Sequence, residues 1–415
     1  MRRRHQFSIG AVLIAAAITA FAEQRLTPAD LPPTELARDS IDQAPTVVQA
    51  RRAFEASGHG AVAMRVGPHE WTTRVTAQRR RYDSGGTSNE WTASLERTLR
   101  IGGKAQIDAQ LGDAELLIGQ ARIGEARHEA ARALADLWID TLATSRQREL
   151  WAEQQGFAES NYRAVEKRRK AGDASVLDLN IAQADLIDVQ RQFSSAATAE
   201  AKAKGKLAVR FPTLKYQPKA LVEPTPLDMS LPQWRDRILA ESDPIKIVQG
   251  ELMKAELTAA RARADRIPDP TVGVFTASEA FRNERVVGIS VSIPLGGSYR
   301  SEKMYQALQE AEAARAKLDA QKREQEAEVV DAYIEATGAL ERWRLVTQGL
   351  ATTRDSARLT QRAYSLGEAD LQSLLLARRQ AIDAATAAEQ ARTEALRWNY
   401  RLLIDAHLIW GLEDD

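Results

Sequence analysis

The chain has 415 residues, no cysteine, and equal numbers of basic and acidic residues, 57 of each. The absence of cysteine excludes disulfides, thiolate metal sites and a lipid anchor on cysteine, and the balanced charge gives no indication of a nucleic-acid partner. Three arginines precede an apolar run from Phe7 to Ala20 and the small-residue pattern Ala20-Phe21-Ala22. This pattern is typical of a secretory signal peptide, so we expect residues 1–22 to be removed on export and the mature chain not to be lipidated.

An N-terminal segment with a first ascending helix, residues 23–67, precedes a predicted β-hairpin, residues 68–101. Apolar and polar side chains alternate along residues 71–78 and again along residues 91–101, with a glycine-rich turn between the two runs. Period-2 alternation indicates strands with one apolar and one hydrophilic face. Such strands suit a membrane barrel with a wet lumen, although the strands of a soluble sandwich alternate too. The mature chain has no run of ~18 apolar residues that would predict a transmembrane helix, so a membrane role requires strands.

Residues 102–210 are expected to form a long coiled-coil hairpin with its tip near residue 172. From Gly103 to Ala171 the chain has no proline and is rich in Ala, Glu, Arg, Gln and Leu, which predicts a helix of ~100 Å if it is continuous. A returning helix is predicted to end near Arg210, with apolar residues that step by three and four as in a coiled-coil seam. The seam residues are Leu179, Ala182, Leu186, Val189, Phe193 and Ala196.

The second half of the chain repeats this plan at an offset of about 195 residues, which indicates a duplicated unit. We expect the helix after the linker to complete the first coiled-coil hairpin, and the N-terminal helix, roughly Thr34 to Arg65, to complete the second. The predicted parts are an equatorial linker (211–232), an ascending helix (233–267), a second β-hairpin (268–295), a second long coiled-coil hairpin with its tip near residue 367 (296–399) and a C-terminal tail (400–415).

These parts predict a mainly α-helical chain with a small β part, built from a duplicated unit of strand, strand and long helical hairpin. Four strands from one chain cannot close a barrel, and an open edge in lipid leaves backbone groups unpaired at several kcal/mol each. Barrels of more than 8 strands can enclose a channel. Oligomerisation is therefore required, and a trimer with four strands per chain would give a 12-stranded barrel around a water-filled pore.

The two predicted tips carry related motifs, G-D-A-S-V-L-D-L at residues 172–179 and G-E-A-D-L-Q-S-L at residues 367–374. Glycine suits the positive φ of a helix-ending turn, and Ser or Asp three residues later can cap the returning helix. A generic helix–turn–helix loop would explain either motif alone. With the duplicated plan, which covers essentially the whole mature chain, the protein resembles the TolC family of outer-membrane efflux proteins.

The resemblance implies a homotrimer in the outer membrane lipid of a Gram-negative bacterium, extending into the periplasm. In such a trimer a 12-stranded outer-membrane β-barrel is continued by a periplasmic α-helical coiled-coil barrel. It also implies docking at the tips onto a periplasmic adaptor and an inner-membrane pump of the resistance-nodulation-division (RND) type. The residues expected at the periplasmic entrance and adaptor-docking surface are Gly172, Asp173, Ser175, Asp178, Gly367, Glu368, Asp370 and Ser373. Those expected at the barrel–helix junctions are Gly102, Gly103, Pro268, Pro270, Pro294, Gly296 and Gly297.

The sequence departs from the family at the second tip. Family members often carry aspartates that narrow the entrance, and the matching positions here are Ser373 and Leu376. An acidic ring is therefore not evident, and how the entrance closes stays open.

Residues 95–104 resemble the stretch before the first long helix of the cobalt-zinc-cadmium type of efflux channel, which implies export of heavy-metal cations by an RND pump. Drug efflux and type I secretion are alternatives, and a soluble periplasmic coiled-coil adaptor or scaffold is an alternative of another class. No enzyme motif occurs in a plausible context, so we expect a passive duct that is not an enzyme and has no cofactor. The mature histidines, His59, His69, His128 and His407, show no ligand spacing, so no metal site is expected.

Three sets of charged residues each have two interpretations. Asp136 and Asp331 occupy matching places in the two repeats and are expected to be inter-helix partners or to line the duct. Residues 79–81, three arginines beside the first turn, could bind lipopolysaccharide phosphates or simply flank the loop in solvent. The basic residues 168–170 at the first tip could dock an adaptor or interact with the helix dipole.

Overall fold

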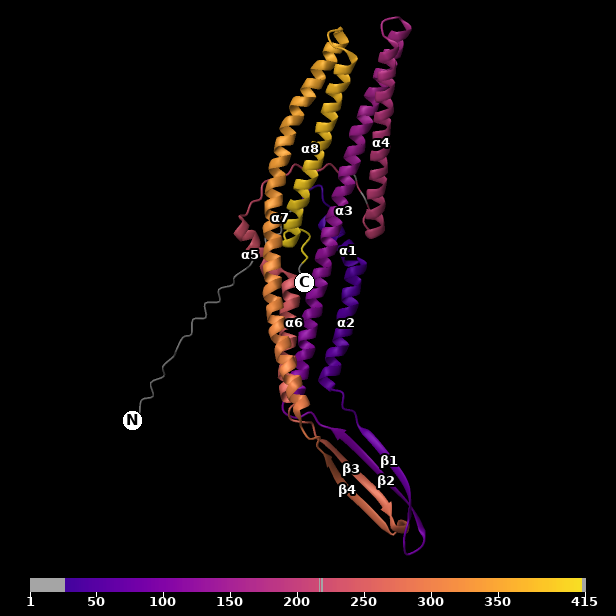
Figure 1. The fold of residues 1–415 in the computed structure, drawn as a ribbon, viewed down its shortest axis with the longest axis vertical. Coiled ribbons are helices and arrows are strands. Elements are labelled where there is room, and N and C mark those ends of the chain that lie inside the picture. The colour runs from indigo at the N-terminus through magenta and orange to yellow at the C-terminus, as the bar shows by residue number, and fades with distance from the viewer. Residues whose placement is uncertain (1–26, 216, 218, 413–415) are drawn as a thin grey trace, which may run out of the picture.

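The protein is an elongated bundle of helices with a four-stranded sheet at one end (Figure 1). The computed structural model describes residues 27–215, 217 and 219–412, so the expected signal peptide lies outside the described residues. The elements are α1 (Thr34–Asp42), α2 (Pro45–Val66), β1 (Thr72–Arg81), β2 (Thr87–Thr98), α3 (Lys104–Lys170), α4 (Val176–Arg210), α5 (Leu231–Glu241), α6 (Asp243–Ala264), β3 (Thr271–Glu279), a 3₁₀ turn (Ala280–Arg282), β4 (Glu284–Ser292), α7 (Ser298–Leu366) and α8 (Leu371–Asp405).

Two of the helices, α3 and α7, run the length of the helical part. They contain 67 and 69 residues, which corresponds to ~100 Å each at 1.5 Å per residue. Their proline-free, alanine-rich sequences were predicted to form such helices, and the structure confirms both. Neither helix meets the hydropathy expected of one that crosses a bilayer, and the same holds for every other helix in the described part of the chain.

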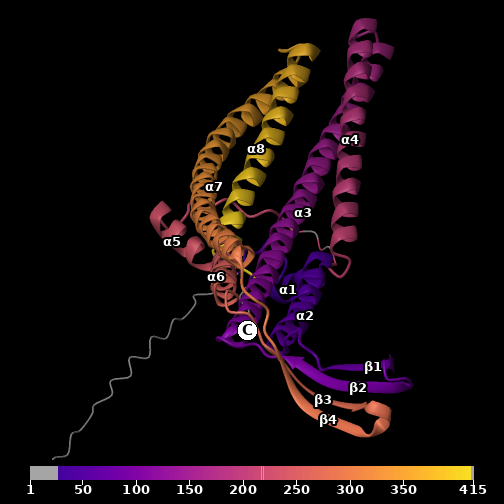
Figure 2. The same cartoon turned by 60° about the horizontal axis from the view of Figure 1, so that its bottom comes forward.

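Shorter helices flank these two, and their pairing differs from the sequence-based expectation. Along α3, α4 covers the half nearer the tip and α2 the half nearer the sheet. Along α7, α8 covers the half nearer the tip, and α6 packs between α7 and α3 in the half nearer the sheet (Figures 1 and 2). The expectation that the N-terminal helix completes the second hairpin was therefore wrong, because α2 packs on α3, whereas the helix within residues 233–267 packs on both long helices. The linker after α4 carries the chain across the middle of the molecule, and ~20 extended residues can span roughly 60 Å.

Proline explains where two expected helices are divided. The N-terminal helix is split between α1 and α2, where Pro45 opens α2, and the ascending helix is split at Ser242, just before Pro244. Proline lacks the N–H that an interior helix position needs but fits the first turn. A third boundary also differs, because α8 continues to Asp405 whereas the tail was expected from residue 400.

The coiled-coil seam predicted in α4 is buried or half-buried along its whole length, as expected. The most extensive core lies at mid-height, where α1, α5, the linker and the segment after α8 pack around α3. Trp138, Trp234 and Trp410 are almost fully buried there. The indole N–H of Trp410 donates to the carbonyl of Pro32 at 3.1 Å, so the C-terminal segment is held against the N-terminal one.

Candidate functional site

The sheet has the order β1-β2-β3-β4 with antiparallel neighbours, and one of its faces is apolar and open. The register places Leu95 opposite Val274 and Val274 opposite Ile289, so these side chains share a face. The exposed fractions of Val274 and Ile289 are 55% and 79%, far above those of core residues. Other large apolar residues exposed on or beside these strands include Trp71, Val75, Trp91, Val287, Val291, Ile293 and Leu295.

The opposite face of the sheet is polar. Arg74 forms an ion pair with Glu96 at 3.3 Å, and Gln78 donates to Glu90 at 3.0 Å. Arg80, exposed near the loop end of β1, also pairs with Glu90 at 3.2 Å. The sheet therefore has the two-faced character that the alternation predicted.

Both edges of the sheet are open in the single chain. β1 has 10 residues and β4 has 9, and each pairs with only one strand within the described residues. Their outer rows of backbone N–H and C=O groups are therefore available to another strand. Edges of this length normally have to be covered or paired.

A buried lysine connects the two repeats where the sheet meets the helices. Lys104, at the start of α3, is 1% exposed. Its Nζ donates to the carbonyl of Ile267 at 2.7 Å and to Asp269 Oδ1 at 2.8 Å. The backbone N–H of Ile101 donates to the same carboxylate oxygen at 3.0 Å, so Asp269 holds both the chain before α3 and the helix itself.

Glycine and proline occur at this junction as the sequence predicted. Gly102 and Gly103 have φ of 68° and 77°, which only glycine adopts without a steric penalty. The remaining predicted positions lie between α6 and β3, or between β4 and α7: Pro268, Pro270, Pro294, Gly296 and Gly297.

At the other end of the molecule, Gly172 turns the chain from α3 to α4 with a φ of 85°. Ser175 and Asp178 then form a capping box: the N–H of Asp178 donates to Ser175 Oγ at 3.0 Å, and the N–H of Ser175 donates to Asp178 Oδ2 at 3.0 Å. The backbone N–H of Ser175, followed by its hydroxyl, lowers the pKa of Asp178. This carboxylate therefore has a structural task at the first tip.

The second tip uses a different cap. Gly367 turns the chain with a φ of 77°, and Asp370 accepts a hydrogen bond from the N–H of Ser373 at 2.6 Å. That bond, followed by the one from the Ser373 side chain, lowers the pKa of Asp370. The two tips share the glycine turn, but Ser caps one returning helix and Asp caps the other.

The two tips also pack against each other. Val165, Ala182 and Leu371 form a buried cluster with Tyr364 against it. The Arg168 guanidinium donates to the Tyr364 hydroxyl at 3.3 Å, a contact between the two hairpins that the sequence did not predict. The predicted docking residues Asp173 and Glu368 are exposed. Exposed apolar side chains lie beside them: Val176, Leu177, Leu366 and Leu376.

Of the two matched aspartates, one is an inter-helix partner. Asp136 of α3 forms an ion pair with Arg397 of α8 at 3.3 Å. Burial raises the pKa of Asp136, against the opposing effect of Arg397. Asp331 is exposed on α7.

The structure brings together three ligand-type side chains that sequence spacing did not connect. A ring nitrogen of His128, a ring nitrogen of His407 and a carboxylate oxygen of Asp243 all lie within 4.8 Å of one another. They come from α3, from the start of α6 and from the segment after α8. No spacing rule could have found them, because ligand motifs are local and these residues lie more than a hundred positions apart. The expectation of no metal site rested on histidine spacing and on the absence of cysteine, and neither signal reports on groups that form only in the folded chain.

Comparison with known proteins gives one family and a set of similar structures. A family model described as outer membrane efflux protein matches residues 234–403, and no curated protein sequence matches the chain. The outer membrane protein VceC from Vibrio cholerae has a TM-score of 0.74 at 16% identity, covering 90% of this chain and 95% of that chain. CusC has a TM-score of 0.73 at 16% identity, covering 90% of this chain and 91% of that chain. The CmeC outer membrane channel of Campylobacter jejuni has a TM-score of 0.71 at 13% identity, covering 92% of this chain and 86% of that chain. At these identities the structures share a fold with this chain.

Proposed function

We propose that this chain, which belongs to the outer membrane efflux protein family, forms with two further copies a passive duct through the outer membrane and the periplasm. The observation that carries the proposal is the open, two-faced sheet, with an exposed apolar face and two unpaired edges. Lipid offers no hydrogen-bond partner to backbone groups, so β1 and β4 need strands from other chains. Pairing β1 of one copy with β4 of the next closes the sheet by rotation, as in other cyclic oligomers.

Three copies would give a barrel with the polar face inside. Side chains alone fill a barrel of 8 strands, whereas one of about 12 strands leaves room for a lumen. The lumen would carry charges of both signs, since Arg74 and Glu96 face it as a pair. On the helical side, α3 and α7 would continue the duct for ~100 Å.

The absence of cysteine allows a direct test of strand pairing. Within one chain β1 and β4 are three strand spacings apart, ~14 Å, whereas a disulfide needs Cα atoms within about 7 Å. Thr76→Cys in β1, combined in turn with a cysteine at each of residues 288–292 in β4, can therefore be oxidised only between chains. We expect one register to give a covalent trimer on a non-reducing SDS gel. Thr76→Cys with Thr92→Cys, directly opposite in β2, is the control for cross-linking within one chain.

The products of this experiment separate the possibilities. A covalent dimer as the final product would show that two chains close the sheet and would contradict the trimer. Monomers at every register would contradict pairing of β1 with β4. A trimer that is also heat-modifiable in outer-membrane fractions would agree with the proposal in full.

We further propose that the tips are the periplasmic entrance and dock an adaptor. The exposed side chains of Leu177 and Leu366, 64% and 65% exposed, lie beside the exposed carboxylates of Asp173 and Glu368, a surface that combines apolar anchors with charge. Replacing both leucines with aspartate should abolish efflux and leave the trimer intact. Val209→Asp is the matched control, because Val209 is 85% exposed but lies at mid-height, at the end of α4. Equal efflux in the double variant and the control would contradict docking at the tips.

For the cargo we propose heavy-metal cations, delivered by an RND pump through the adaptor. The support is the resemblance of residues 95–104 to the cobalt-zinc-cadmium type of channel. Drug efflux and type I secretion are the alternatives, while a soluble periplasmic scaffold is not favoured for a chain of this family. The test expresses the chain, with the pump and adaptor of its own host, in cells that lack their own channel. Restored tolerance to Zn²⁺, Co²⁺ or Cd²⁺ supports metal export, and tolerance restored only to antibiotics or dyes would refute it.

A further inference from the structure

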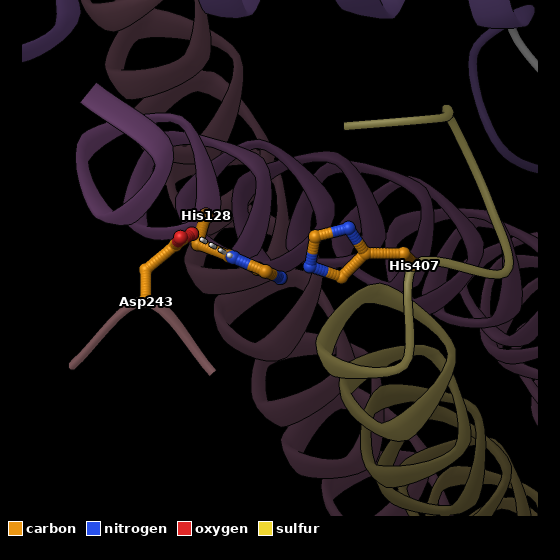
Figure 3. A group of neighbouring side chains, drawn as sticks. All are labelled: His128, Asp243 and His407. Atoms are coloured by element: carbon orange, nitrogen blue, oxygen red, sulfur yellow. Dashed lines mark hydrogen bonds and ion pairs between the residues drawn. The ribbon is translucent and has the colours of Figure 1, made fainter. Parts of the chain in front are cut away.

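The group of His128, Asp243 and His407 lies in the mid-height core, away from both the sheet and the tips (Figure 3). His128 and Asp243 are 5% and 7% exposed. His407 turns one ring nitrogen toward His128, while the carboxylate of Asp243 faces the other side of the His128 ring. The three side chains come from three separate parts of the chain, and the His128 ring lies between the carboxylate and His407 (Figure 3).

Hydrogen bonding at His128 is incomplete in either neutral form of the ring. Its Nε2 lies 3.1 Å from the carbonyl oxygen of Ile404, and its Nδ1 lies 3.4 Å from Asp243 Oδ2. Both neighbours are acceptors, and a neutral imidazole has one N–H. If Nε2–H donates to Ile404, the lone pair of Nδ1 faces a carboxylate oxygen, and a buried pair of this kind is stabilised by a cation between the two atoms.

The distances match those of a metal centre. Zinc binds imidazole nitrogen and carboxylate oxygen at about 2.0 to 2.2 Å in tetrahedral geometry, which places two ligand atoms about 3.4 Å apart. The separation of His128 Nδ1 from Asp243 Oδ2 is 3.4 Å. The hydrogen bond from the other ring nitrogen to a backbone carbonyl is the usual second contact of a metal-binding histidine, and it fixes the tautomer.

His407 supplies an independent observation. Neither of its ring nitrogens has a hydrogen-bond partner among the described residues, although both atoms are buried. Unsatisfied buried polar atoms are uncommon and usually mark an ion, a water or a functional role.

The backbone at His407 is also unusual. The N–H of Leu408 donates to the carbonyl of Leu403, and that of His407 to Ile404, which is the Schellman motif that ends a helix. Glycine normally occupies the left-handed position of this motif, but here His407 occupies it with a φ of 56°. A non-glycine residue in this conformation is sterically unfavourable, and a ligand on the imidazole would offset that cost.

The surrounding chain makes room for the Asp243 carboxylate. At Gly124 of α3 the space that a Cβ would need is occupied by this carboxylate, so any larger residue would push it away. A further carboxylate, Glu125, lies one turn before His128 and interacts electrostatically with both His128 and Asp243. Glu125 or a water molecule would complete four-fold coordination.

We propose that His128, Asp243 and His407 bind one divalent transition-metal ion of the zinc class per chain. Two imidazoles and a carboxylate form the ligand set that such ions prefer over Mg²⁺ or Ca²⁺. The ion is structural: it fastens the segment after α8 to α3 and α6 in the wall of the duct. The third ligand has to approach by at most about 1.4 Å, from the observed limit of 4.8 Å to about 3.4 Å, which side-chain rotation of His407 can supply.

The test measures metal on the purified mature trimer in detergent, first stripped with EDTA. After addition of Zn²⁺ and desalting, elemental analysis should give one zinc per chain, and Co²⁺ should give the visible absorption of a nitrogen- and oxygen-ligated site. Zn²⁺ should raise the midpoint of thermal unfolding and slow proteolysis after residue 405, whereas Mg²⁺ should do neither. These readouts do not depend on transport. The metal-site proposal can therefore fail while the proposed duct function holds, and the duct function can fail while the metal site is confirmed.

Two variants and one control sharpen the result. His407→Asn keeps a residue that tolerates positive φ but removes the imidazole, and His128→Gln keeps a donor for Ile404. Each should lower zinc affinity at least tenfold while the heat-modifiable trimer persists. His59→Asn, at an exposed histidine on α2, should bind zinc as the unaltered chain does. Absence of bound zinc in the unaltered trimer, or equal binding in the His407 variant and the control, would overturn the proposal.

Discussion

Replacing Lys104 with methionine isolates the buried contact that connects the two repeats at the junction of sheet and helices. Methionine fills similar space but has no charge and cannot donate to the carbonyl of Ile267 or to Asp269. Removing one partner of a buried ion pair typically costs 3 to 5 kcal/mol. The carboxylate of Asp269 keeps its bond from the N–H of Ile101 and is 13% exposed, so we expect the low end, about 3 kcal/mol per chain.

A double-mutant cycle separates the pair from general damage at this site. Asp269→Asn keeps an oxygen for Ile101 and Lys104 but removes the charge, and we expect it to cost about 2 kcal/mol. If the two side chains act as a pair, the combined variant should cost about 3 kcal/mol, which gives a coupling of about 2 kcal/mol. Asp265, at 3.4 Å from Lys104 Nζ and 40% exposed, is too well solvated to replace Asp269.

The assay is urea unfolding of the mature trimer, followed by tryptophan fluorescence at one fixed chain and detergent concentration, because oligomer stability depends on concentration. Lys303→Met is the control: Lys303 is exposed near the start of α7, and its replacement should change the free energy of unfolding by less than about 0.5 kcal/mol. The reasoning is refuted if the losses in the single variants add to that in the double variant within about 0.5 kcal/mol.

Three further predictions concern the sheet and the tips. Val75→Arg, on the apolar face, should cost about 2 to 4 kcal/mol in folding into lipid and reduce the heat-modifiable trimer, whereas Thr76→Arg, the next residue on the polar face, should not. The lowered pKa of Asp370 means that its cap stabilises α8 above the ordinary pKa of 3.8 and is lost as pH falls through the lower folded value. Amide exchange in the first turn of α8, corrected for its intrinsic rate, should therefore rise at low pH, and Asp370→Asn, which keeps a capping oxygen, should remove that change. Gly367→Ala should lower the free energy of unfolding by about 1 kcal/mol because of the positive φ. Gly349→Ala inside α7, where a Cβ meets open space, should raise it by up to ~1 kcal/mol. Thermal unfolding should therefore show a lower midpoint for the first variant and a higher one for the second.

The parts of the fold that were predictable depend on local signals. Alternation of side chains along residues 71–78 and 91–101 is a property of the pleat, and the absence of proline from 103 to 171 is a property of one helix. The glycines of the tips were predictable for the same reason, because Gly172 and Gly367 are needed for their own φ. Each of these signals depends only on residues that are close together in the sequence.

The features that were missed depend on tertiary packing. Nothing in residues 34–65 says whether the helix there packs on α3 or on α7, and nothing in residues 233–267 says that the helix there packs between both. The contact of Arg168 with Tyr364 joins the two tips across 196 positions. His128, Asp243 and His407 converge only because α3, α6 and the C-terminal segment meet at mid-height. Sequence periodicity identifies the faces of a helix but not the partner of each face.

The arrangement of contacts suggests where the duct can move. At the junction, Lys104 is held by buried hydrogen bonds, and at mid-height the large core holds both ends of the chain. Above that core, two small clusters among the described residues join the hairpins, one of Leu150, Leu350, Ala385 and Ala388 and one around Val165 and Leu371 at the tips. The partly exposed pair of Arg168 and Tyr364 adds a polar contact at the tips. Since exposed polar contacts contribute about 0 to 1 kcal/mol each, the tips are the least costly place to separate the two hairpins. We therefore expect the two hairpins to separate at the tips by hinging of the helices above the mid-height core, with the sheet and junction unchanged.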